Sequence, residues 1–174
     1  LAYSWMDGKV PEREDLGDGL KALFKTYSIT EPYPLKFNDG LVKIHLQSLD
    51  FAVRQGVEKE HAAHFVYVLG PVLERHIKPA VAKLGKNIFL WGIFERTSCS
   101  YQLYEHINIK EGERSFPCPY KNVLEYLNKD RGTYIIKWND VCTKWCGLTW
   151  NGFAEVAGVK LTIKPGETCT VKVV

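Results

Sequence analysis

Two alternating runs joined by a turn end the chain: Val159-Lys160-Leu161-Thr162-Ile163, then Lys164-Pro165-Gly166-Glu167, then Cys169-Thr170-Val171-Lys172-Val173-Val174. Apolar and polar residues alternate with the period of two that is typical of a half-buried strand, and a Pro-Gly pair is typical of a tight turn. Cys169, Val171 and Val173 share the apolar face. The segment predicts an antiparallel hairpin, and with it an α+β fold that has a small, mostly antiparallel sheet.

A helix is predicted just before this hairpin. Asn139 or Asp140 is placed to cap its N-terminus and Gly158 to end it. Its apolar face carries residues at helical spacing: Cys142, Trp145, Cys146, Thr149, Phe153 and Val156. Gly147 and Gly152 interrupt the helix, and each costs about 1 kcal/mol relative to alanine. We therefore expect a close neighbour here, either a crossing strand or a ligand against the backbone.

Shorter elements are predicted between this helix and the middle of the chain. From Asn87 onward, apolar residues alternate as in a hairpin: Phe89, Trp91, Ile93, Tyr101 and Leu103. The segment 110–117 is rich in turn residues. Pro119 then opens a short helix with Cys118 at its N-cap, because proline is favoured at the first helical position. Residues 134–136 are predicted to form a short strand.

The first half of the chain is predicted to be helical. Apolar residues recur at helical spacing over three ranges: 16–27, 39–54 and 58–85. Pro71 lies inside the third range and is expected to kink or split that helix, since proline cannot donate a backbone hydrogen bond. We expect a helical half over residues 1–86 and a cysteine-bearing α/β half over residues 87–174.

Length and charge limit the classes of partner. The 174 residues have the length of a single domain. The 23 Lys and Arg residues are interspersed with 20 Asp and Glu residues, so we expect no nucleic-acid partner. No apolar run approaches the roughly 18 residues of a membrane span, and residues 1–5 lack the pattern of a signal peptide. We expect a soluble, cytoplasmic protein with no membrane partner and a small-molecule ligand; a homodimer is left open.

Cysteine is concentrated near the C-terminus. The chain has five cysteines, and four of them lie at or beyond residue 118. An odd number excludes complete pairing within the chain, and free thiols are the rule in a reducing compartment. We therefore expect these thiols to serve in catalysis, metal binding or core packing rather than as a disulfide scaffold.

Cys118 is the candidate nucleophile. At a helix N-cap its sulfur would face unpaired backbone amides and the positive end of the helix dipole, which favour the thiolate. His106, which is close in sequence to the turn before Cys118, is the candidate catalytic base. His45 is either a core residue or a further candidate base. The alternative for Cys118 is an inert thiol in a turn that Pro117 and Pro119 stiffen.

Cys142 and Cys146 lie one helical turn apart and therefore project from the same face. Together with Cys169, and with Cys118 or Cys99 as further thiols, they are candidate ligands for zinc or another thiophilic metal. The alternative is that both pack as small hydrophobic residues beside the aromatic side chains of the helix.

Four short motifs carry a resemblance to a known family: Cys118-Pro119-Tyr120, Asp140-Val141-Cys142, Gly152-Phe153 and Pro165-Gly166-Glu167-Thr168-Cys169-Thr170-Val171-Lys172-Val173. They resemble the C-terminal part of the L-2-amino-thiazoline-4-carboxylic acid hydrolase-like proteins. These are similar in turn to the 4-vinyl reductase domain, a small α/β ligand-sensing and sometimes zinc-binding module. The resemblance covers about residues 88–174. Cys118, Cys142 and Cys169 match the recurring cysteines of the family, whereas Cys146 has no match.

Two functions follow as expectations. The first is a hydrolase that cleaves a carbon-nitrogen or carbon-sulfur bond of a small heterocyclic or amide substrate, as the resemblance implies. Its nucleophile would be the Cys118 thiolate or a thiolate-bound metal water, and an aromatic pocket would hold the substrate: Trp91, Tyr101, Trp145 and Trp150. The second is a non-enzymatic module of the 4-vinyl reductase type, in which that pocket senses a small molecule and the cysteines bind zinc. A third alternative is that the protein is a structural subunit that binds a partner protein.

Overall fold

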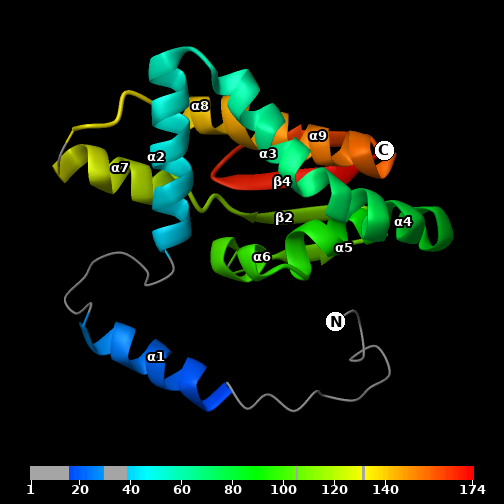
Figure 1. Ribbon diagram of the computed structural model, residues 1–174, viewed down its shortest axis with the longest axis horizontal. Coiled ribbons are helices and arrows are strands. Elements are labelled where there is room, and N and C mark those ends of the chain that lie inside the picture. The colour runs from blue at the N-terminus through cyan, green and yellow to red at the C-terminus, as the bar shows by residue number, and fades with distance from the viewer. Residues whose placement is uncertain (1–15, 30–38, 105, 131) are drawn as a thin grey trace. The chain divides into compact units, whose positions relative to one another are not determined.

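The computed structural model describes residues 16–29, 39–104, 106–130 and 132–174 (Figure 1). The chain divides into two units, Leu1–Phe37 and Asn38–Val174. In the first unit, α1 (Leu16–Ile29) confirms the helix predicted over residues 16–27. All five cysteines lie in the second unit.

Helical segments follow one another through the first part of the second unit: α2 (Asp39–Gln55), α3 (Glu58–Val72), η2 (Leu73–Ile77), α4 (Lys78–Leu84), α5 (Asn87–Glu95) and α6 (Ser98–Leu103). The helices predicted over residues 39–54 and 58–85 are confirmed. Gly56 separates α2 from α3 with a φ of 71°, a value that glycine adopts without the steric cost other residues meet.

Pro71 widens its helix instead of breaking it. The proline lies inside α3, and the π-helical segment η2 begins two residues later and leads without interruption into α4. A π-helical turn is one of the ways in which a helix accommodates an irregularity in its hydrogen bonding. The helix is therefore not split near Pro71; its winding changes from α-helical to π-helical and back.

The hairpin predicted from Asn87 onward is wrong, because the structure has α5 and α6 there. Phe89, Leu90 and Phe94 of α5 are all fully buried. Apolar residues therefore occupy more than one side of this helix, and part of the apolar sequence also alternates as it would in a strand. α6 begins with a capping box in which Ser100 N–H donates to Thr97 Oγ1 (3.0 Å) and Thr97 N–H donates to Ser100 Oγ (3.1 Å).

The sheet has four antiparallel strands in the order β1-β2-β4-β3: β1 (Asn108–Lys110), β2 (Glu113–Pro117), β3 (Leu161–Lys164) and β4 (Thr168–Val173). The C-terminal hairpin is confirmed, and the fold is α+β. β1 and β2 lie mostly where turns were predicted. β2 pairs with β4 so that Phe116 lies opposite Cys169.

The helix before the last hairpin is continuous but changes its winding. It consists of α8 (Trp138–Asp140), the π-helical segment η3 (Val141–Cys146) and α9 (Gly147–Ala157). It begins at Trp138, slightly before the predicted N-caps, and Asp140 Oδ2 accepts the Lys137 N–H at 2.8 Å. It ends at Gly158, as predicted, with a left-handed φ of 73°.

The close neighbours of Gly152 and Gly147 belong to α3 and to the helix itself. Gly152 faces Val66 of α3. A Cβ on Gly147 would lie 3.0 Å from the carbonyl oxygen of Cys142, which belongs to the same helix. The two glycines that interrupt the pattern are therefore explained by helix packing and by the π-helical segment.

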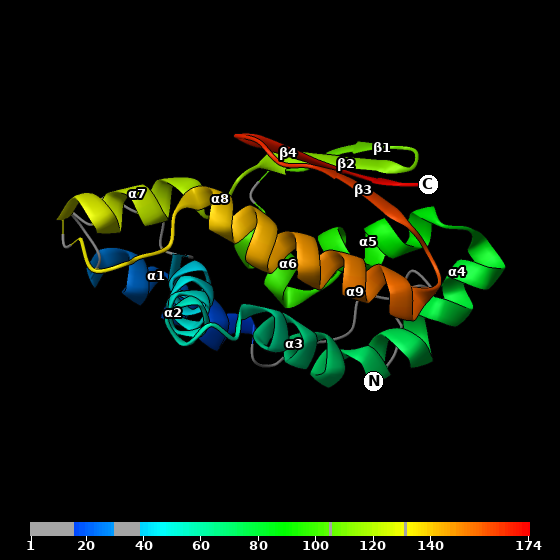
Figure 2. The ribbon, with the colours of Figure 1, turned by 90° about the horizontal axis from the view of Figure 1, so that it is seen from above.

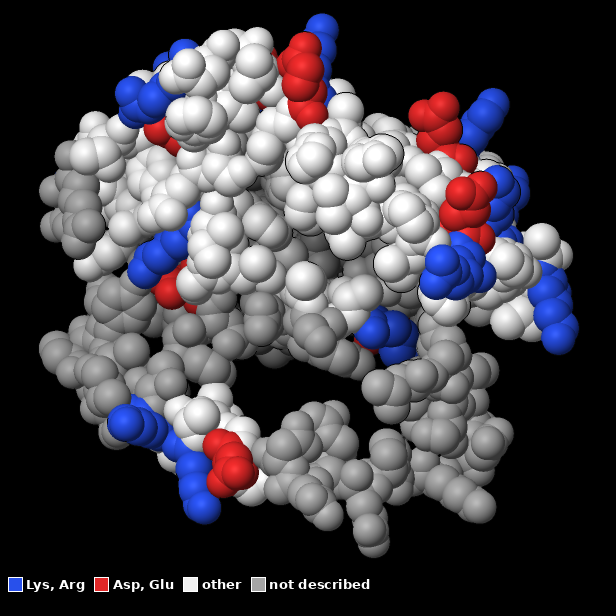
Figure 3. Space-filling model, in the orientation of Figure 1, with Lys and Arg blue, Asp and Glu red and all other residues white. Residues whose placement is uncertain are grey.

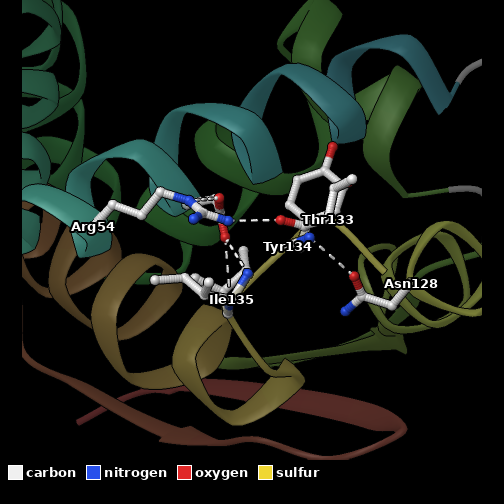
Figure 4. A network of polar contacts seen from close by, with 7 residues as sticks. Arg54, Asn128, Thr133, Tyr134 and Ile135 are labelled. Carbon is white, nitrogen blue, oxygen red and sulfur yellow. Dashed lines mark hydrogen bonds and ion pairs between the residues drawn. The ribbon is translucent and has the colours of Figure 1, made fainter. Parts of the chain in front are cut away.

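Residues 134–136 do not form the predicted strand. The backbone N–H groups of Ile135 and Ile136 both donate to Asp50 Oδ1 of α2, at 2.7 and 3.2 Å, as Figure 4 shows. Arg54 Nε donates to Asp50 Oδ2 (2.7 Å), and Arg54 Nη2 donates to the Thr133 carbonyl oxygen (2.6 Å). The donors of an extended segment are therefore satisfied by a buried side chain instead of a neighbouring strand.

The core of the second unit lies between the sheet and its helices. In Figure 2 the sheet lies along one side of α9 and α3 lies along the other. Large apolar side chains fill the space beneath the sheet: Phe89, Phe94, Phe116, Trp150, Phe153 and Val171. Burying an apolar side chain of this size contributes about 1.5–3 kcal/mol.

The surface carries charges of both signs. Lys and Arg side chains alternate with Asp and Glu side chains over the face that Figure 3 shows, without a large area of one sign. In the part of the chain that the structure describes, no helix has both the length and the apolar character needed to cross a membrane.

Candidate functional site

Four cysteines line one cavity: Cys118, Cys142, Cys146 and Cys169. The rest of its wall is uncharged: Phe116, Pro119, Tyr120, Val141, Trp150, Ile163, Pro165 and Gly166. Its volume is about 20 Å³, which is room for about one water molecule. The thiols that are dispersed in the sequence therefore meet at a single place.

Pairing of the two central strands brings two of the thiols together. Cys118 directly follows β2, and its N–H donates to the carbonyl oxygen of Glu167 (2.8 Å), which continues the β2–β4 ladder past Pro117. Cys169 lies on β4 and is buried. Cys142 and Cys146 reach the cavity from η3, one turn apart on the same face of the helix.

Cys118 does not lie at a helix N-cap, as the sequence predicted. α7 (Lys121–Asp130) begins three residues later, and its first helical bond runs from Leu124 N–H to the carbonyl oxygen of Tyr120 at 2.9 Å. Tyr120 is therefore the N-cap. Pro119 takes no helical position, because two turn residues separate Cys118 from the helix.

A tryptophan and a lysine lie around Cys118. Trp138 Nε1 donates a hydrogen bond to Cys118 Sγ at 3.2 Å. Lys121 Nζ lies 4.9 Å from the centroid of the Trp138 ring and forms an ion pair with Glu167. The hydrogen bond with Glu167 raises the pKa of Lys121, so the amine stays charged at neutral pH.

The other three cavity thiols stay protonated at neutral pH. Burial raises the pKa of Cys169 to about 12, with neighbouring Cys118 as the next cause. Burial also raises the pKa of Cys146 well above its usual value, and that of Cys142 in the same direction. Cys118 differs from these thiols because its sulfur accepts the indole N–H of Trp138. The four thiols are therefore chemically unequal.

The structure describes no metal site. Among the described residues, no three His, Cys, Asp or Glu side chains are arranged to hold a metal ion. Cys142, Cys146 and Cys169 share a cavity wall. Zinc binding stays a prediction from the sequence.

The four aromatic residues expected around a substrate are distributed more widely. Trp150 lines the cavity. Trp145 is buried beside it and stacks on His61, with ring centroids 5.0 Å apart. Trp91 lies beneath Arg96, whose guanidinium carbon is 4.6 Å from the ring centroid. The side chain of Tyr101 lies outside the described residues.

The histidines take different places. His106 is exposed, precedes β1 by two residues and is not part of the cavity wall. His45 Nδ1 and the Tyr120 hydroxyl are joined by a hydrogen bond (2.9 Å), and Trp145 Nε1 donates to the same hydroxyl oxygen (3.4 Å). Burial, and then the nearby His61, lowers the pKa of His45 to about 4. Burial raises the pKa of Tyr120 well above 10, so both partners are neutral at pH 7.

Tyr120 and Trp138 are the site residues that sequence reasoning missed. Tyr120 forms part of the cavity wall, and Trp138 holds the sulfur of Cys118. For Tyr120 the signal was its place directly after Cys118-Pro119. Trp138 has no signal of its own, because its contact depends on how β2 and the last helix meet.

The fold and the site together define an α+β unit with a thiol-lined cavity. Comparison of the chain with protein-family models, with curated proteins and with solved structures found no match in any of the three. A function must therefore be inferred from the geometry of the cavity and the chemistry of Cys118.

Proposed function

We propose that the protein is a small-molecule hydrolase in which the Cys118 thiolate attacks a carbon atom bonded to nitrogen or sulfur in a small heterocyclic or amide substrate. The observation that carries this proposal is the hydrogen bond from Trp138 Nε1 to Cys118 Sγ (3.2 Å) at the wall of a cavity. A donor aimed at sulfur becomes a stronger partner as negative charge develops on it.

The inequality of the four thiols supports the choice of nucleophile. Cys142, Cys146 and Cys169 have raised pKa values because they are buried. A thiolate, not a thiol, is the attacking species. Cys118 alone among the cavity thiols accepts an indole N–H and lies near the Lys121 charge.

The reaction would proceed in two steps. Attack by the Cys118 thiolate forms a carbon-sulfur bond to the enzyme, and the amine or thiol that leaves takes up a proton. A water molecule then cleaves the enzyme-bound intermediate and restores the thiol. The half-exposed position of Cys118 supports the second step, because water can reach the intermediate from solvent.

The wall of the cavity indicates which part of a substrate could enter. Among the described residues that line it, none has a charged side chain, and a charged group without a partner there would meet a large desolvation cost. The reacting end of the substrate is therefore small and uncharged. A charged group elsewhere on the substrate would stay outside, near Lys121 and Glu167.

The test is turnover of a panel of small amides, thioesters and 2-amino-thiazoline rings, with mass spectrometry of the enzyme-bound intermediate. Cys118→Ser is expected to reduce kcat/KM by about 100-fold or more. Cys99→Ser is the matched control, since that thiol is exposed and lies outside the cavity wall. Trp138→Phe keeps a ring but removes the donor, and should reduce kcat/KM about tenfold, as expected for one hydrogen bond to a charged group. Full turnover by Cys118→Ser would refute the proposal.

A non-enzymatic sensing module is the second candidate. The neutral thiols and apolar side chains of the wall support it, since they suit the binding of an uncharged ligand group. In that function Cys118→Ser leaves the affinity for the ligand nearly unchanged, and no covalent intermediate accumulates on the wild-type protein. Zinc held by the cysteines would be an addition to this candidate, and metal analysis of protein purified without chelator tests it.

A further inference from the structure

Cys142 lies four residues after Trp138, whose indole holds Cys118. The two residues belong to one continuous helix, and residues with this spacing project from the same face. The indole of Trp138 contacts Cys118 Sγ at 3.2 Å, and both thiols line the same cavity. Both are half-exposed, whereas Cys169 is buried.

We propose that Cys118 and Cys142 form a peroxide-oxidisable thiol pair that closes to a disulfide and thereby blocks the cavity. The proposal shares with the proposed function the nucleophilic thiolate of Cys118, but it does not need the hydrolase reaction. In this second role, two thiols of the cavity wall are reversibly oxidised to a disulfide.

The chemistry balances with hydrogen peroxide as the oxidant. The Cys118 thiolate attacks one peroxide oxygen; a sulfur-oxygen bond forms, the oxygen-oxygen bond breaks, and the hydroxide that leaves takes a proton from solvent. The sulfur of Cys142 then attacks the sulfenic acid; a sulfur-sulfur bond forms, and the oxygen leaves as water with the Cys142 proton. Two thiols are oxidised, and one peroxide is reduced to two water molecules.

The roles within the pair follow from the surroundings of each sulfur. Cys118 has the indole donor and is the sulfur that attacks peroxide. Burial, and then the proximity of Cys118, raises the pKa of Cys142, so this residue stays a thiol until the sulfenic acid has formed. Cys146 lies one further turn from Trp138 and is a poorer partner for that reason.

The size of the cavity is compatible with the oxidant. A volume of about 20 Å³ admits a molecule close to water in size, which hydrogen peroxide is. Cys118 is also half-exposed, so hydrogen peroxide can reach its sulfur from solvent.

The test is peroxide treatment of the full chain, blocking of remaining thiols with N-ethylmaleimide, and peptide mapping by mass spectrometry without reduction. Disulfide formation should lower the mass of the wild-type protein by two hydrogen atoms before the remaining thiols are blocked. Digestion should then yield a pair of peptides joined through Cys118 and Cys142. Cys142→Ser should instead accumulate a dimedone-reactive sulfenic acid at Cys118. Cys146→Ser and Cys99→Ser are matched controls and should still form the disulfide.

Two results would overturn this proposal: a Cys118 sulfenic acid that persists equally in the wild-type protein and in Cys142→Ser, or a disulfide that joins other residues. Hydrolase activity is measured on the same samples. A disulfide in a protein that hydrolyses no substrate supports the thiol pair and refutes the proposed function. Hydrolysis by a protein that forms no disulfide supports the proposed function and refutes the thiol pair.

Discussion

Val66 of α3 packs directly against Gly152 of α9: a Cβ placed on Gly152 would lie 2.6 Å from Val66 Cγ2. Real Cβ atoms do not approach other atoms so closely. The two helices therefore meet at a distance that only glycine allows, and this contact holds α3 against the helix that carries Cys142 and Cys146.

Gly152→Ala is expected to destabilise the protein by about 1 kcal/mol. The alanine gains about 1 kcal/mol in helix propensity, but overpacking against Val66 costs about 1–3 kcal/mol. Val66→Ala should relieve the clash, so the double variant is expected to be more stable than the sum of the two single changes predicts, by about 1 kcal/mol. Urea denaturation of the four proteins measures this coupling.

Gly40→Ala is the matched control for this cycle. Gly40 is also in a helix, is exposed and has open space around the position of an added Cβ. It should stabilise the protein by up to about 1 kcal/mol, because only helix propensity acts there. Equal effects at Gly40 and Gly152 would show that the contact with Val66 does not limit the packing.

Arg114→Met is expected to cost about 3–5 kcal/mol, the range for removing one partner of a buried ion pair. Arg114 is only 1% exposed. Its Nε donates to Glu95 Oε1 (2.5 Å), and its Nη1 donates to the Lys110 carbonyl oxygen (2.7 Å). These bonds join the β1–β2 turn to α5. Thermal unfolding followed by circular dichroism measures the loss.

The exposed residue Lys164 on β3 provides the control, and Lys164→Met should change stability by less than about 0.5 kcal/mol. The double variant Arg114→Met with Glu95→Leu should be more stable than Arg114→Met alone, since it leaves no unpaired carboxylate. If the double variant were as unstable as the single variant, the cost would come from packing and not from the ion pair.

Stability should fall as the pH is lowered from about 6.5 to about 4, and His45 should account for part of the fall. Its pKa is lowered from 6.5 to about 4 in the folded protein. Between these values the unfolded chain binds the proton and the folded protein does not, so protonation favours unfolding. A shift of this size is worth roughly 3 kcal/mol. The pKa of His61 is lowered as well and adds in the same direction.

His45→Gln should flatten this dependence, because glutamine can accept the Tyr120 hydrogen bond but does not titrate. The free energy of unfolding from urea titrations at pH 7.5, 6, 5 and 4 measures the slope. His106→Gln replaces an exposed histidine and should keep the slope of the wild-type protein. A slope that persists in His45→Gln would place the pH dependence at other groups.

Long periodic segments were predictable from the sequence, and buried polar partners explain much of what was not. The helices after Leu16, Asp39 and Glu58 have regular apolar spacing, and their prediction is confirmed. β2 was missed because its inward-facing residues include Arg114, which looks like a surface residue unless its partner Glu95 is known. The apolar repeat alone cannot reveal a strand that buries a cation.

The candidate site was predictable in its composition but not in its arrangement. The concentration of cysteines indicated a site near the C-terminus, and the cavity contains all four of them. The expected helix N-cap was misplaced, since helix boundaries depend on which carbonyl takes the first hydrogen bond. The contact of Trp138 with Cys118 joins two segments that no local pattern relates.

Asp50 also affects the position of Trp138, which lies beyond the segment that its carboxylate binds. Its carboxylate fixes the backbone of Ile135 and Ile136, and Trp138 follows two residues later. The position of the indole over Cys118 is therefore set in part from α2, by a residue that is not in the cavity wall. A remote carboxylate thus helps to position the hydrogen-bond donor of a sulfur atom that it does not touch.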